Sequence, residues 1–139
     1  MKKMTLFFIA VLCCLFSCKN ERSIDGVWRK TIGSQKLFVY EIDGSTGFVV
    51  MGRNDKTEMI GLFDWVNDSV CNVINRKGEN LGKATFHSSF KSGNSEAMFV
   101  DGFYDFDAWS KDKDVDEEET KVIKATLSII LPEIKEKMK

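Results

Sequence analysis

Between residue 24 and about residue 106, hydrophobic and polar positions alternate along the chain in short runs. Sequences rich in Gly, Asn, Asp and Ser separate these runs, for example "DGSTG" at 43–47 and "RKGEN" at 76–80. A period of two is typical of half-buried strands, and these separating residues are typical of turns. We therefore predict seven strands, at 27–32, 36–42, 47–51, 57–65, 69–75, 81–90 and 96–106.

The connections between these strands are short, and no proline falls among them. Short connections favour antiparallel neighbours, because a parallel pair needs a long crossover. The predicted fold is therefore mainly β, a small antiparallel meander barrel or sandwich of about 7–8 strands with a C-terminal helix.

The strand at 96–106 is apolar on both faces, with Met98 and Val100 on one side and Ala97 and Phe99 on the other. Such a strand needs a cover, and we expect the C-terminal helix to provide it.

The pattern after residue 111 changes to a helical period. Asp116 and Glu119 form a capping-box arrangement, and Pro132 is expected to bend or restart the helix. An apolar stripe on one face could pack on the sheet or lie on a membrane, and we favour packing on the sheet. The stripe consists of Ile123, Leu127, Ile130 and Ile134.

The first residues form a different kind of segment. Lys2 and Lys3 precede an apolar run at 4–16, which is interrupted only by Thr5. As a helix, this run would reach about 20 Å, against roughly 30 Å of bilayer hydrocarbon. A basic start and a short apolar run are typical of an export signal.

The sequence Leu15-Phe16-Ser17-Cys18 resembles the lipobox of bacterial lipoproteins. This resemblance implies that Cys18 receives a diacylglyceryl thioether and becomes the first residue of the mature chain. Lys19 follows, instead of the Asp that retains such proteins in the inner membrane. In a Gram-negative cell the resemblance therefore implies an anchor in the outer membrane of the cell envelope, with the domain facing either the periplasm or the outside. The predicted organisation is a signal peptide at 1–17, a tether at 18–23, a β domain at 24–110, and an acidic linker with a helix at 111–139.

The charge of the chain bears on its partners, and its cysteine content bears on disulfide formation. Without Lys2 and Lys3, the chain has 18 basic and 21 acidic residues, a balance that argues against nucleic acid. Once Cys18 is lipidated and Cys13 and Cys14 are removed, Cys71 is the only cysteine left, so no internal disulfide can form.

Candidate chemistry is sparse. Cys71 could in principle pair with His87, the only histidine, but a cysteine within a strand is more often a small buried hydrophobic residue. The series Asp112, Asp114 and Asp116 could begin a calcium loop, yet the Gly and Glu that an EF-hand requires are missing. We therefore expect no catalytic residues, no metal and no cofactor.

Gly26-Val27-Trp28 resembles the Gly-x-Trp motif that opens the first strand of lipocalins. The resemblance implies an eight-stranded barrel, whose eighth strand could lie at 103–109. It also implies an Arg on the last strand that packs against the Trp, and this chain has no Arg after Arg76. It also implies a small apolar ligand in the barrel mouth. The alternative is a structural or interaction lipoprotein that binds an envelope protein. The candidate ligand-binding residues are Trp28, Tyr40, Phe63, Trp65, Phe86 and Tyr104.

Overall fold

The computed structural model describes residues 24–87, 90–92, 95–104 and 107–139. The predicted signal peptide and the lipidation site Cys18 lie outside these residues. Within them, no helix is long and apolar enough to cross a membrane.

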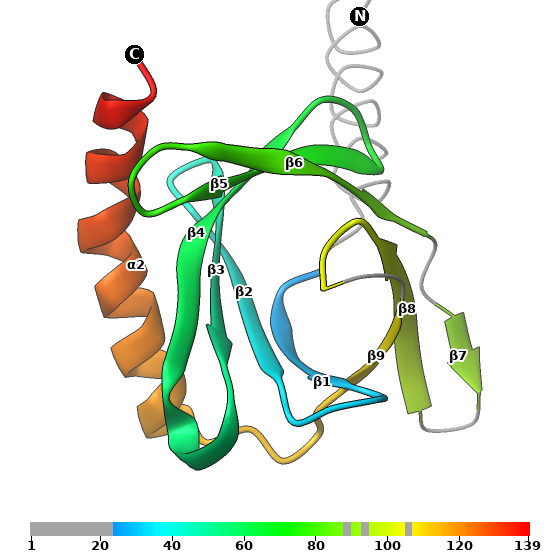
Figure 1. Ribbon diagram of the computed structural model, residues 1–139. Helices are drawn as coiled ribbons and strands as arrows, with labels where there is room; N and C mark the ends of the chain where they lie inside the picture. The colour runs from blue at the N-terminus through cyan, green and yellow to red at the C-terminus, as the bar shows by residue number, and fades with distance from the viewer. Residues whose placement is uncertain (1–23, 88–89, 93–94, 105–106) are drawn as a thin grey trace, which may run out of the picture.

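An antiparallel sheet closes into a barrel (Figure 1). In the sheet the order is β6-β5-β4-β3-β2-β1-β9-β8-β7, and an additional pairing of β6 with β8 closes an eight-stranded ring. The short strand β7 pairs with β8 outside that ring. The fold is therefore mainly β, as predicted. Its strands are β1 (Gly26–Lys30), β2 (Lys36–Ile42), β3 (Ser45–Met51), β4 (Thr57–Trp65), β5 (Val70–Asn75), β6 (Asn80–Phe86), β7 (Phe90–Ser92), β8 (Ser95–Asp101) and β9 (Asp107–Lys111).

The prediction of one strand at 96–106 is wrong. Strand β8 ends at Asp101, and the chain turns at Gly102 and Tyr104, whose φ angles are +88° and +55°. A side chain at Gly102 would also meet the Lys83 carbonyl oxygen, since an added Cβ would lie only 2.3 Å away. The eighth barrel strand is β9, which pairs with β8 and with β1.

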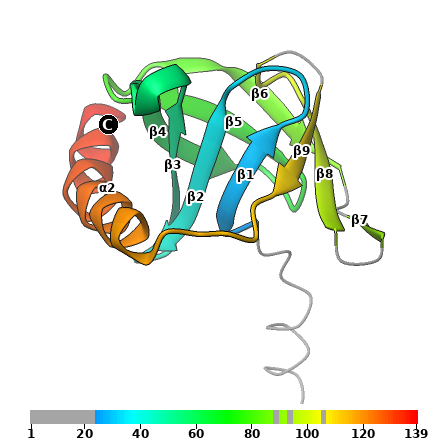
Figure 2. The ribbon, with the colours of Figure 1, turned by 90° about the horizontal axis from the view of Figure 1, so that it is seen from below.

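Helix α2 (Glu117–Lys137) packs on the outside of the barrel, against β2, β3 and β4 (Figure 2). This confirms packing on the sheet, but the prediction that the helix covers the strand at 96–106 is wrong. Strands β2 and β3 need the cover more, because most of their side chains are buried on both faces. Gly47 allows α2 to approach β3 closely, because a Cβ added at Gly47 would lie only 3.0 Å from the Leu127 and Leu131 side chains. The buried helix residues are Ile123, Leu127, Ile130, Leu131 and Ile134.

The helix begins at the predicted position, with Asp116 as its N-cap. The Asp116 carboxylate accepts hydrogen bonds from the backbone N–H groups of Glu118 and Glu119, at 2.9 and 3.3 Å. The Glu119 side chain pairs with Lys36 of β2 at 2.9 Å, which ties the first helical turn to the barrel. The helix continues through Pro132 to Lys137, so the predicted restart is wrong.

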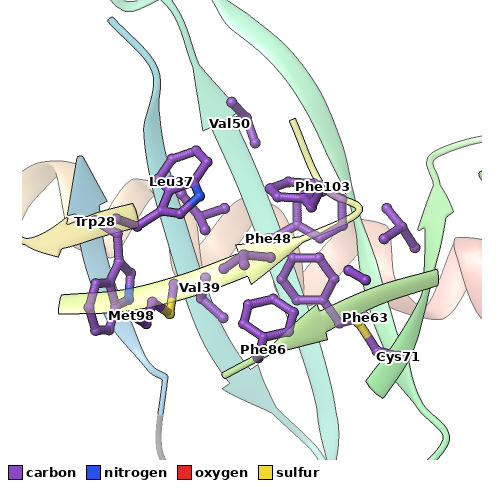
Figure 3. Close-up of a cluster of buried hydrophobic side chains, with 14 residues drawn as sticks. Trp28, Leu37, Val39, Phe48, Val50, Phe63, Cys71, Phe86, Met98 and Phe103 are labelled. Carbon is purple, nitrogen blue, oxygen red and sulfur yellow. The ribbon is translucent and has the colours of Figure 1, made fainter. Parts of the chain in front are cut away.

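The barrel interior is filled by its own side chains (Figure 3). Aromatic rings occupy much of it: Phe48 stacks on Phe63 with centroids 4.3 Å apart, and Phe86 meets Phe63 edge-on at 5.2 Å. Two separate cores therefore stabilise the protein, one inside the barrel and one between the barrel and α2. All their buried residues lie between Val27 and Ile134.

Candidate ligand-binding pocket

The six predicted ligand-binding residues do not share one surface. Trp28, Phe63 and Phe86 are buried inside the barrel, and the partly buried Trp65 and Tyr104 pack against the same core. The sixth residue, Tyr40, lies outside the barrel in the core beneath α2. The prediction of Tyr40 as a wall residue of a ligand site in the barrel mouth is therefore wrong, because on β2 Leu37 and Val39 face inward.

A pocket of about 230 Å³ lies between three barrel strands and the turn that follows β8. Leu81 on its rim is 52 % exposed, so the pocket is open to solvent. Of the predicted residues, Tyr104 alone lines it. The lining residues are Met59, Val73, Leu81, Gly102, Phe103 and Tyr104.

Phe103 forms the inner wall of this pocket. Its side chain is only 3 % exposed and lies edge-on to both Phe48 and Phe63, with ring centroids 5.4 Å apart in each case. Figure 3 shows Phe103 beside Phe48 in the aromatic core of the barrel. The pocket is therefore separated from the deeper interior by an aromatic ring that belongs to the β8–β9 turn.

Tyr104 provides a polar group at the pocket. Its hydroxyl donates a hydrogen bond to the Glu58 carboxylate at 3.3 Å. Burial, together with the nearby negative charge of Glu58, raises the pKa of Tyr104 to about 12. The phenol therefore remains protonated at neutral pH, and the pocket contains one hydroxyl that is already engaged as a donor.

Trp28 occupies a distinct position inside the barrel. Its indole N–H donates to the Ile24 carbonyl oxygen at 2.8 Å, and the Lys111 ammonium lies 5.4 Å from the ring centroid. Lys111 belongs to the last barrel strand and is also 3.7 Å from the Glu96 carboxylate. Lys111, a cation on the last barrel strand, thus faces the Trp of the Gly-x-Trp sequence. The lipocalin resemblance implies an Arg at this place, and here the cation is a Lys.

Cys71 and two of the linker carboxylates have structural roles. Cys71 is fully buried, and burial raises the pKa of its thiol to about 12, so the thiol is protonated at neutral pH. His87, the residue that Cys71 could have paired with, is exposed. In the acidic linker, Asp112 pairs with Arg29 at 3.1 Å, and Asp116 caps α2. Across the described ranges, no group of three or more His, Cys, Asp or Glu side chains could hold a metal ion.

The comparisons with known proteins found no matching family model, no similar curated protein and no similar solved structure.

Proposed function

We propose that this protein is a lipid-anchored protein of the bacterial envelope that binds a small, mainly apolar ligand. The observation that carries the binding proposal is the solvent-open pocket between Met59, Val73, Leu81 and the Phe103–Tyr104 turn. Apolar side chains around a concave site, with few polar groups, are typical of small-molecule binding. The closed barrel and the Lys111–Trp28 contact support a lipocalin-like interpretation.

The pocket volume limits the ligand. A pocket of about 230 Å³ is smaller than the roughly 300–1,000 Å³ that is usual for drug-sized molecules. The proposed ligand is therefore a compound with a single ring or a short chain. The exposed Glu58 carboxylate accepts the hydrogen bond of Tyr104, so it places a negative charge next to one lining residue, which disfavours an anionic ligand.

The anchor part of the proposal depends on the lipobox resemblance at Leu15–Cys18. Each buried CH₂ group contributes about 0.8 kcal/mol to membrane binding, so several acyl chains on Cys18 would hold the barrel durably at a membrane. We expect Cys18→Ala to accumulate as an uncleaved, unlipidated precursor in a bacterial host. Intact mass measurement tests this, and maturation of the variant to the normal size would contradict it.

Native mass spectrometry tests the binding proposal. The segment 19–139, which contains every buried residue of both cores, would be purified from cells without detergent. We expect a retained small molecule on the wild-type segment. Leu81→Trp should exclude it by filling the rim of the pocket.

A matched control adds the same bulk elsewhere. Val122→Trp changes a residue that is 63 % exposed on α2, outside the barrel, and it should retain the ligand. Equal retention by the two variants would place the ligand outside the pocket and refute the proposed site.

The alternative function is binding to an envelope protein, and one observation favours it. Val122 and Ile129 are seven residues apart on α2 and are 63 % and 69 % exposed, so the outer face of the helix has apolar positions two turns apart. If this face binds a partner, charged substitutions at both positions would abolish the association and leave ligand retention unchanged.

A further inference from the structure

The three tryptophans differ in their hydrogen bonding. The Trp28 indole donates to the Ile24 carbonyl oxygen, and the Trp65 indole donates to the Thr46 hydroxyl, each at 2.8 Å. The Trp109 side chain is fully buried, and within the described part of the chain its Nε1–H has no hydrogen-bond partner. Buried polar groups are nearly always paired, so an unpaired buried donor calls for an explanation.

Trp109 lies next to the walls of the pocket. Its ring centroid is 6.1 Å from that of Phe103 and 6.3 Å from that of Tyr104, and both of these residues line the pocket. Its strand, β9, places it opposite Lys30 of β1 and Met98 of β8. A ligand that displaces the Phe103 ring would thus extend from the pocket toward the Trp109 indole.

The surroundings limit what could satisfy this donor. The core side chains packed around Trp109 are aromatic and aliphatic, so an ionised group there would lose most of its hydration. The ammonium of Lys30, the residue opposite Trp109 on β1, already donates to the Ile32 carbonyl oxygen. The exposed Glu58 carboxylate, bonded to the Tyr104 hydroxyl, adds a negative charge next to a lining residue and disfavours an anion. An uncharged acceptor, such as a carbonyl oxygen, meets both conditions.

We infer that the barrel binds an uncharged ligand with an apolar body and one carbonyl group. This ligand displaces the Phe103 ring, and its carbonyl oxygen accepts a hydrogen bond from Trp109 Nε1–H. The inference rests on the proposed function and adds the chemical class of the ligand. It makes Trp109 the specificity-determining residue and gives its buried, unpaired donor a partner in the bound state.

A pair of probes of the same shape tests the inference. Acetophenone and ethylbenzene share a phenyl ring and a two-carbon side chain, but only acetophenone has a carbonyl. Each would be titrated into the full chain in lipid nanodiscs, and binding would be followed by the indole N–H resonances of ¹⁵N-labelled tryptophan. Comparing variants in the same nanodiscs cancels the partitioning of each probe into lipid.

Trp109→Phe removes the N–H donor and keeps an aromatic ring. We expect it to weaken acetophenone binding about tenfold more than ethylbenzene binding, which corresponds to the upper range for one net hydrogen bond. Trp65→Phe is the matched control, because the Trp65 donor is already bonded to Thr46. This control should leave the ratio of the two affinities unchanged.

The wild-type spectra give an independent measurement in case Trp109→Phe fails to fold. Trp28→Phe and Trp65→Phe assign two of the three indole signals, and the third belongs to Trp109. Acetophenone should move the Trp109 signal downfield, and ethylbenzene should not.

The outcomes separate the two proposals. If neither probe binds the wild-type protein, the proposed function fails, and the inference fails with it. If both probes bind, but Trp109→Phe leaves the ratio of their affinities unchanged and the Trp109 signal responds to both probes alike, the inference alone is refuted. The apolar pocket then still stands.

Discussion

Leu127→Ala tests whether α2 is an integral part of the fold. Leu127 is fully buried in the core between the helix and β2–β4, whereas Ile129, two residues later on the same helix, is 69 % exposed. Truncating a buried Leu to Ala costs about 2–5 kcal/mol, through lost burial and the cavity left behind. Truncating an exposed residue usually changes stability by less than about 0.5 kcal/mol.

These free energies translate into a measurable difference in melting temperature. For a domain of this size, each kcal/mol corresponds to about 4 °C, so we expect Leu127→Ala to lower Tm by about 8–20 °C. Ile129→Ala, the matched control, should lower it by less than about 2 °C. The thermal unfolding of each variant is followed by circular dichroism at one wavelength for helix and one for β-sheet. Equal melting temperatures for the two variants would refute the packing of α2 on the barrel.

A second substitution refines this test. An alanine Cβ at Gly47 of β3 would lie 3.0 Å from the Leu127 Cδ2 atom, so Gly47→Ala overpacks the interface and should cost about 1–3 kcal/mol. In the Leu127→Ala background the Leu127 contacts are gone while Leu131 Cδ1 remains 3.0 Å away, so the cost should fall in part. Urea denaturation of the two single variants and the double variant measures the coupling, which we expect to be about 0.5 kcal/mol or more. Strict additivity would show that Gly47 and Leu127 do not meet.

Two further predictions concern alkaline pH and the start of α2. The pKa of Cys71 is raised from 9.0 to about 12, so the unfolded thiol ionises first, and the free energy of unfolding should fall as pH rises from 9 to 12. Cys71→Ala should lose less stability over that range in urea titrations, and an identical pH profile would contradict this. Asp116→Ala removes two accepted hydrogen bonds at the helix N-terminus and should cost about 1 kcal/mol, whereas Asp114→Ala should change stability by less than about 0.5 kcal/mol. Thermal unfolding compares the two, and equal effects would contradict the capping role.

Much of the barrel could be predicted from the sequence, because its strands follow local rules. Flanking turn residues place β2 and β4 at the predicted residues, and the acidic residue at position 116 correctly marks the start of the helix. These signals work because turns and caps depend on residues that are neighbours in the chain.

The position of the helix could not be predicted by the same rules. The alternation in β2 is obscured because Phe38 and Tyr40 face the helix, while Leu37 and Val39 face the barrel interior. A strand that is buried on both faces shows a continuous apolar run, and this run does not reveal which element covers it. The segment at 96–106 showed the same pattern for a different reason, because part of it turns inward.

The pocket follows from that inward turn, and the sequence gives only a weak signal for it. Gly102 follows Asp101 within the otherwise apolar segment, and its φ of +88° together with the 2.3 Å between an added Cβ and the Lys83 carbonyl oxygen makes any other residue unfavourable there. The turn at Gly102 converts an expected strand into a wall of the pocket, with Phe103 inside the barrel and Tyr104 bonded to Glu58. It also places both aromatic rings beside Trp109. One glycine therefore positions this wall of the pocket. In the binding mode that we propose, the unpaired Trp109 donor beside Phe103 would favour an uncharged ligand that carries an acceptor.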